Sequence, residues 1–300
     1  MPDYRAHLDA SITFVNGGSL SVDGFRLDLP SGDLDEATIG RLLVQHLGLT
    51  LVGSVELRNL SIVEEAHRGS RDVPRAAGER ERRVVDLSHV IRAGLVTYPG
   101  LPEPTIAPFL TREASKANYA PGTQFAMDVM TLIGNTGTYL DSPWHRYEGG
   151  TDLAGLDLAT LVDLRAEVFH VRDSAERGVP ASVFFDRDVS GAAVLIDTGW
   201  DRHFATPAYA VDAPFLAPDA VDYLIGQGAI LVGIDSLNID DTRDTKERPA
   251  HTRLLAAGIH VVEHLTRLDE LPPSGARFTS APPAIEEFGT FPVRAYAIVQ

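Results

Sequence analysis

The 300-residue sequence predicts an α+β protein: a main domain with a mixed sheet or barrel-like core, preceded by a small ββαβ appendage. Most of the chain consists of short β-branched runs separated by turn-forming residues, whereas few segments have the apolar periodicity of a helix. A charged stretch over 68–83 contains proline and glycine and lacks apolar periodicity, as is typical of a linker. We therefore expect a small N-terminal segment over 1–67, a linker over 68–83 and a main domain over 84–300.

The N-terminal segment has the pattern of two strands, one helix and a third strand, expected at residues 10–16, 20–29, 33–48 and 54–64. Asn16-Gly17 lies between the first two strands and suits a tight turn that needs positive φ. Nothing in this segment concentrates catalytic residue types. We expect it to make oligomer contacts or to cover a site.

The main segment contains seven short β-branched runs, expected as strands at residues 84–91, 125–133, 164–171, 192–199, 229–235, 259–265 and 293–299. Two helices fit between them, at residues 217–227 and 250–257. Many strands, few helices and turn clusters between them favour an α+β domain with a mixed sheet or barrel-like core.

The composition disfavours several classes of function. The formal charge of −16 argues against nucleic-acid binding, because phosphate backbones need basic surfaces. There is no polybasic membrane patch and no apolar run of about 18 residues, so we expect no membrane association. The N-terminus lacks the apolar core of a signal peptide, and a cytoplasmic protein is expected. Because cysteine is absent, any metal must be held by His, Asp, Glu or weaker oxygen donors.

The most informative stretch is residues 134–150, GNTGTYLDSPWHRYEGG, which follows an apolar run. In an extended chain, alternation would place Asn135, Tyr139 and Asp141 on one face, and a turn at Pro143 would return His145 toward them. A carboxylate can bind a cation, and an imidazole can move a proton near neutral pH. An isolated pair of this kind is more often a capping aspartate and a surface histidine, but the density of polar groups here favours a site.

A second stretch, residues 233–271, carries further candidates at the ends of predicted elements. His251 opens the short helix and Glu263 ends the strand that follows it. Functional groups at strand ends and in connecting loops are where a site is expected. His260 and His264 fit packing or surface positions better than a catalytic role.

Residues 84–300 resemble the metal-dependent cyclase family, which includes bacterial kynurenine formamidases and isatin hydrolases. The family pattern is H-x-G-T-H-x-D-x-P-x-H, and five of its seven defined positions match, namely Gly137, Thr138, Asp141, Pro143 and His145. DLSHVI, TYPGLP, Ala250-His251, Val262-Glu263 and the C-terminal tail are also similar to the family. The resemblance implies a swivelling β/β/α fold assembled as homodimers or homotetramers.

The resemblance also implies roles for individual residues. Asp141, His251 and Glu263 keep the positions of one set of metal ligands, and His145 keeps the position of the proton donor and acceptor. Asn135 and Tyr139 replace two motif histidines, and an amide oxygen or neutral phenol is a weak ligand. We therefore expect one divalent metal, zinc or manganese, with an open position for water.

Three functions remain open on the sequence. The leading one is a hydrolase that opens an amide, lactam, lactone or formamide bond of a small molecule by metal-activated water, with His145 as proton carrier. The second is a metal-independent lyase, dehydratase or cyclase in which Tyr139 and His145 act as acid and base and Asn135 donates to an oxyanion. The third is a ligand-binding protein that has lost catalysis.

Aromatic residues near these motifs are candidates for substrate contacts. Tyr98 lies where the family often has an aromatic substrate contact, and Phe125 and Trp144 could pack on a planar ligand. Ordinary core packing is an equally good interpretation for each of the three.

Overall fold

The computed structural model describes residues 3–65, 82–172, 174–243 and 246–299. The chain forms two compact units, Met1–Glu79 and Arg80–Gln300. The expected linker at 68–83 lies outside the described residues except for Arg82 and Arg83, so the expected boundaries stay predictions. Within the described parts of the chain, no helix is both long and apolar enough to cross a bilayer. The cytoplasmic location also stays a prediction.

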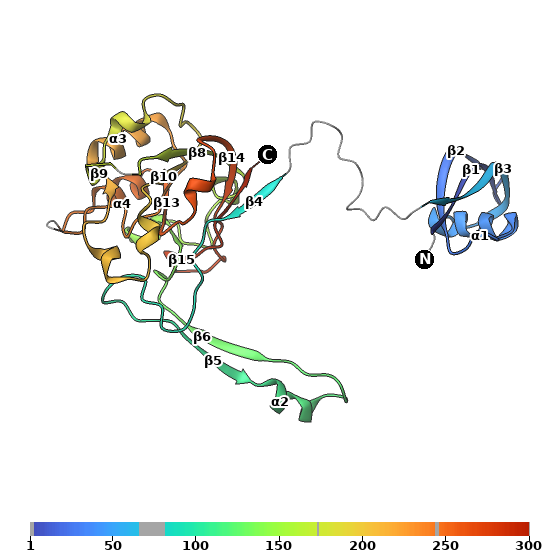
Figure 1. Cartoon of the computed structure of the whole chain (residues 1–300), viewed down its shortest axis with the longest axis horizontal. Coiled ribbons are helices and arrows are strands. Elements are labelled where there is room, and N and C mark those ends of the chain that lie inside the picture. The colour runs from blue at the N-terminus through green and yellow to red at the C-terminus, as the bar shows by residue number, and fades with distance from the viewer. Residues whose placement is uncertain (1–2, 66–81, 173, 244–245, 300) are drawn as a thin grey trace. The chain divides into compact units, whose positions relative to one another are not determined.

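The predicted ββαβ order of the first unit is confirmed, with β1 (Asp3–Phe14), β2 (Ser19–Leu29), α1 (Glu36–His46) and β3 (Val52–Glu65) (Figure 1). The strands form an antiparallel sheet in the order β2-β1-β3. Asp35 caps α1 by accepting the backbone N–H of Thr38 at 2.7 Å. Ile39 and Leu43 of α1 are buried with Leu8 of β1, so this unit has its own apolar core.

The second unit is built on one mixed sheet of nine strands in the order β15-β7-β13-β12-β10-β8-β14-β16-β4 (Figure 1). In chain order these are β4 (Arg83–Asp86), β7 (Tyr139–Asp141), β8 (Leu164–His170), β10 (Ala193–Asp197), β12 (Leu231–Ile234), β13 (His260–Glu263), β14 (Ser274–Thr279), β15 (Thr290–Pro292) and β16 (Tyr296–Val299). The four central strands, β8, β10, β12 and β13, run parallel, and antiparallel strands extend the sheet on both sides. The predicted α+β class with a mixed sheet is confirmed.

Each side of the large sheet has an apolar core, because the central strands are buried on both faces. Helices α3 (Pro218–Gln227) and α4 (Pro249–Ala256) pack against β10, β12 and β13 in one core. The other core includes side chains from β4, β8, β14 and β16. A short parallel pair, β9 (Gly178–Val179) and β11 (Phe215–Leu216), completes the body of this unit.

A hairpin projects from this body, which we call the arm, residues 105–131 (Figure 1). It comprises β5 (Thr105–Leu110), the short helix α2 (Arg112–Ser115) and β6 (Met127–Thr131), with β5 and β6 paired antiparallel. The apolar run at 125–133 is therefore a strand as predicted, but β6 is exposed along its whole length. Phe109 in β5 is 74% exposed.

The extended chain predicted before Asp141 is shorter in the structure. Only residues 139–141 form a strand, and residues 134–138 bend. Gly137 has φ +67°, and a side chain there would approach Ile91 Cγ1 at 3.0 Å. The shared face predicted to begin at Asn135 therefore holds only for Tyr139 and Asp141.

Candidate active site

The register of three strands brings the first group of site residues together. β7 lies between β13 and β15 and pairs antiparallel with both. Tyr139 is opposite Glu263 of β13, and Asp141 is opposite Thr290 of β15. Because side chains two residues apart share a face, these four side chains lie on the same side of the sheet.

Asp141 is fully buried at the end of β7. Its Oδ1 accepts the hydroxyl of Thr290, whereas Oδ2 is buried and makes no hydrogen bond with any described residue. Burial alone would raise the pKa of Asp141, but His251 and His145 hold the pKa below its usual value. A buried anionic oxygen without a hydrogen bond is costly unless a cation occupies the space beside it.

His251 faces that oxygen from the first turn of α4. Pro249 begins the helix, and Asp240 accepts the backbone N–H groups of Ala250 at 2.7 Å and His251 at 3.1 Å. Asp240 also lies 2.7 Å from Nδ1 of His251, which orients the ring. Nε2 of His251 is then 3.5 Å from Oδ2 of Asp141.

The electrostatic environment of His251 is strongly anionic. Burial lowers the pKa of His251, but the charges of Glu263 and Asp141 and the hydrogen bond to Asp240 outweigh it and raise the pKa well above 6.5. Nε2 is 3.6 Å from Oε1 of Glu263. The ring nitrogen thus lies between two buried carboxylates.

His145 ends the short turn that starts at Pro143, and its side chain is 35% exposed. Its Nδ1 lies 2.8 Å from the hydroxyl of Thr290. Gly289 permits this approach, because a Cβ there would lie 2.5 Å from the backbone nitrogen of His145. Thr290 has one hydroxyl proton, which it donates to Asp141, so it must accept from Nδ1–H of His145. The lone pair of a neutral His145 is therefore on Nε2.

Glu263 and Tyr139 form a buried pair on the same face. The Tyr139 hydroxyl donates to Oε2 of Glu263 at 2.6 Å and lies 3.2 Å from Nε2 of His264. Oε1 of Glu263 accepts the backbone N–H of Ile239 at 2.6 Å. Burial raises the pKa of Glu263 to about 7, and burial with the charge of Glu263 raises that of Tyr139 well above 10. Tyr139 is thus a proton donor held on a carboxylate.

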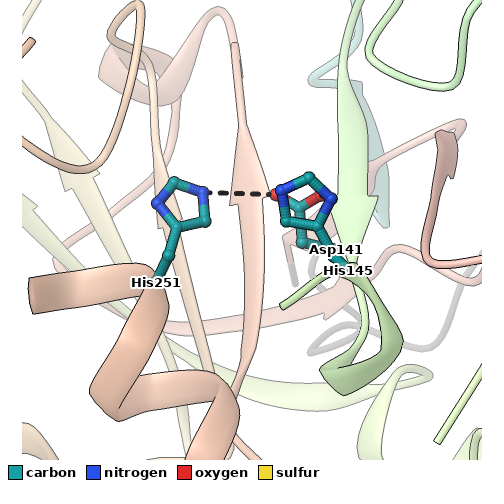
Figure 2. A group of neighbouring side chains, drawn as sticks. All are labelled: Asp141, His145 and His251. Atoms are coloured by element: carbon teal, nitrogen blue, oxygen red, sulfur yellow. Dashed lines mark ion pairs between the residues drawn. The ribbon is translucent and has the colours of Figure 1, made fainter. Parts of the chain in front are cut away.

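Three of these side chains form a cluster that can hold a metal ion. One ligand atom from each of Asp141, His145 and His251 lies within 4.8 Å of the others (Figure 2). The unbonded Oδ2 of Asp141 and the oriented His251 ring fit a divalent cation, because ligating histidines usually donate their other N–H to a carboxylate. The carboxylate and imidazole donors suit zinc or manganese.

A cleft of about 780 Å³ opens onto this cluster. Its lining includes most of the residues predicted from the sequence: Tyr98, Asn135, Tyr139, His145, His251 and Glu263. The other two predicted aromatic contacts are elsewhere. Trp144 lines a smaller hollow of about 360 Å³ that shares Asn135 and His145 with the cleft. Phe125 lies on the arm, where its ring packs against Tyr119.

Three residues of the site were not predicted from the sequence. Thr290 contacts His145, Asp240 contacts His251, and His264 contacts Tyr139. No sequence motif marks Thr290 as a site residue, because its role depends on the pairing of β15 with β7. Asp240 is one of several acids in the stretch 233–271 and becomes distinctive only through its position before α4. His264, expected at a packing or surface position, is fully buried, and burial lowers its pKa to about 3.

Comparison with known proteins gives consistent matches. A family model described as "Putative cyclase" matches residues 85–241. A kynurenine formamidase from Geobacillus thermodenitrificans is 26% identical over 70% of this chain and 95% of its own length. An isatin hydrolase with a bound product analogue matches 73% of this chain and 93% of its own, with TM-score 0.62 and 24% identity. A structure described as "potential metal-dependent hydrolase with cyclase activity" has TM-score 0.60 and 24% identity over 73% of this chain and 98% of its own.

Proposed function

The chain belongs to the cyclase family, and on that premise we propose that it is a hydrolase that opens an amide, lactam, lactone or formamide bond of a small molecule. The observation that carries the proposal is the pair of Asp141 and His251, whose facing atoms are 3.5 Å apart. His251 and His145 both line the cleft, and Nδ1 of His145 contacts Thr290, which leaves Nε2 to take a proton. The similarity to a formamidase and to an isatin hydrolase supports cleavage of a C–N bond.

The proposed cofactor is one divalent metal ion, zinc or manganese. Asp141 through Oδ2 and His251 through Nε2 would hold it, with Glu263 as the third ligand. When bound, such an ion would polarise the substrate carbonyl and activate water. Asp240 keeps the His251 ring in a single orientation, and Tyr139 keeps Glu263 in place.

His145 carries the proton in the proposed reaction. Nε2 removes a proton from the attacking water while the water oxygen bonds to the carbonyl carbon. It then returns the proton to the leaving nitrogen or oxygen as the bond between that atom and the carbonyl carbon breaks. Thr290 keeps the Nδ1 proton in place throughout, so the proton that moves from the water to the leaving group passes through Nε2 alone.

The hydrogen bonds of Tyr139 favour hydrolysis over the metal-independent alternative. An acid–base pair of Tyr139 and His145 would need the phenol proton at the substrate, whereas it is donated to Glu263. Asn135, which lines the cleft, can still donate its amide to a developing oxyanion in either mechanism.

The test is turnover of formanilide and simple lactones by the wild type and by His145→Ala. We expect the substitution to lower kcat by about 10²- to 10⁴-fold without loss of bound metal. His46→Ala, in the first unit, is the matched control and should keep wild-type turnover. A His145→Ala enzyme with unchanged kcat would exclude the proposed proton carrier.

We also propose a homodimer or homotetramer. The support comes from the arm, because an isolated two-stranded hairpin is only marginally stable in water. Exposed apolar side chains follow both of its strands: Ile106, Phe109, Met127, Val129 and Met130. Contact with a second copy would cover them.

A further inference from the structure

The cleft has opposite charges in its buried and exposed parts. The most buried acid in its lining is Glu263, and the fully buried Asp141 lies close to two further lining residues, His145 and His251. The more exposed part of the lining carries four basic side chains and one acid: Arg146, Lys246, Arg248, Arg253 and Glu247. The chain has a formal charge of −16, so a basic group at this place is not a consequence of average composition.

The two arginines that flank Thr252 differ in what they already bind. Arg253 is held by both oxygens of Asp222, at 2.9 and 3.0 Å, so its charge is compensated within the chain. Arg146 makes one hydrogen bond, from Nε to the Thr252 hydroxyl at 3.3 Å. Within the described residues, Nη1 and Nη2 of Arg146 have no partner.

A second contact also holds the Arg146 side chain. Its Cζ lies 5.7 Å from the centroid of the Tyr147 ring. The Tyr147 hydroxyl donates to the backbone oxygen of Thr252 at 2.7 Å, which ties the same two segments together. A guanidinium anchored through Nε presents its two terminal nitrogens as a planar fork, which matches the two oxygens of a carboxylate.

Arg146 is also placed next to the reacting groups. It directly follows His145 in the chain, and its partner Thr252 directly follows His251. A ligand anion bound to Arg146 would lie in the basic part of the cleft and leave the neutral end of the ligand toward Asp141 and His251. The opposite orientation would place the anion at the buried end of the cleft, away from the four basic side chains.

We propose that Arg146 binds a carboxylate of the substrate, so that the substrates are small amides, lactams or esters that carry a carboxylate group. This rests on the proposed function for the bond that is cleaved, but the carboxylate site itself depends only on Arg146 and Thr252. Thr252 is a positioning residue, because it acts by fixing the guanidinium. The proposed ligand group is a carboxylate, because its two coplanar oxygens can pair with the two terminal nitrogens of Arg146.

The first experiment measures binding without turnover. Calorimetry or ligand-observed NMR compares benzoate, benzamide and phenyl phosphate on the wild type, Arg146→Gln and Arg253→Gln. We expect benzoate to bind best to the wild type and to lose about 10- to 100-fold in affinity on Arg146→Gln, with little change on Arg253→Gln. Tighter binding of phenyl phosphate than of benzoate, or equal benzoate affinity in wild type and Arg146→Gln, would overturn the carboxylate site.

The second experiment compares kcat/KM for formanilide with and without an ortho carboxylate. In Arg146→Gln we expect kcat/KM of the carboxylate compound, divided by that of plain formanilide, to fall about 10- to 100-fold. The fall should come mainly from a higher KM for the carboxylate compound. Arg146→Lys, which keeps the charge but not the planar guanidinium, should recover part of this ratio. Thr252→Val should lower the ratio less. Hydrolysis of both compounds with no preference for the carboxylate would reject this inference and leave the hydrolase proposal intact. Arg146-dependent benzoate binding with no hydrolysis of either compound would support the carboxylate site and reject the hydrolase proposal.

Discussion

The hydroxyl of Thr290 lies 2.8 Å from Nδ1 of His145 and donates its own proton to Asp141. One threonine therefore connects the proposed metal ligand to the proposed proton carrier and determines which ring nitrogen carries the proton. Thr290→Val should lower kcat by about 10- to 100-fold, because the His145 ring loses its fixed tautomer and orientation. Thr290→Ser keeps the hydroxyl and should restore most of the rate.

The pH profile separates this role from a loss of fold. If Thr290 fixes the tautomer, Thr290→Val changes the pH dependence of kcat while the far-ultraviolet circular dichroism and melting temperature stay close to those of Thr290→Ser. An unchanged pH profile with a lower melting temperature would instead indicate a purely structural threonine.

Metal content distinguishes ligands from the proton carrier. Asp141→Asn and His251→Ala should each bring the metal measured by mass spectrometry well below one ion per chain, because each removes a proposed ligand. Asp240→Asn should weaken metal affinity by about 10- to 100-fold, since it frees the His251 ring. Chelation of the wild type should abolish turnover and lower the melting temperature.

His145→Ala decides between two ligand sets in the same measurement. The atoms of His145 lie close enough to Asp141 and His251 to ligate, whereas we assign the third position to Glu263. Full metal content in His145→Ala together with loss in Glu263→Gln would support our assignment. The opposite result would move His145 from proton carrier to ligand.

Buried neutral histidines should make the protein less stable in mild acid. Burial lowers the pKa of His260 from 6.5 to about 4, and its Nε2 lies 2.9 Å from the Thr160 hydroxyl. The unfolded chain takes up a proton on this residue below pH 6.5 and the folded chain does not, so stability falls as the pH drops from about 6.5 to 4. One such group contributes a slope of about 1.4 kcal/mol per pH unit. Urea unfolding of wild type and His260→Gln across this range should show the smaller slope in the variant.

The arm should hold copies of the chain together. Replacing Phe109 and Val129 by Asp places charges among the exposed apolar side chains of the arm, so we expect a homodimer or homotetramer to dissociate. Light scattering after size exclusion measures the mass. Leu158→Asp, at an exposed apolar position outside the arm, is the control that should keep the wild-type mass. A monomeric wild type would reject the proposed assembly.

The sequence predicted the parts of the fold and site that depend on local pattern. Alternation placed Tyr139 and Asp141 on one face, and the ends of predicted elements located His251 and Glu263. Thr290 and Asp240 could not be found in this way, because their roles come from strand register and from a loop that folds back onto a helix start. The run at 125–133 shows another limit: apolar alternation predicts a strand but does not say whether other residues of the same chain cover it.

The pairing of β7 with β13 and β15 has a consequence for how the protein reaches its active state. Tyr139 and Glu263 are 124 residues apart in the chain, and Asp141 and Thr290 are 149 apart. Contacts across such long loops form slowly during folding, because the chain must lose the entropy of closing each loop before the contact stabilises it. Both strands that complete β7 come from the last fifth of the sequence. A chain emerging from the ribosome therefore has no assembled site until synthesis is almost finished, and on refolding the recovery of activity should coincide with the slowest phase.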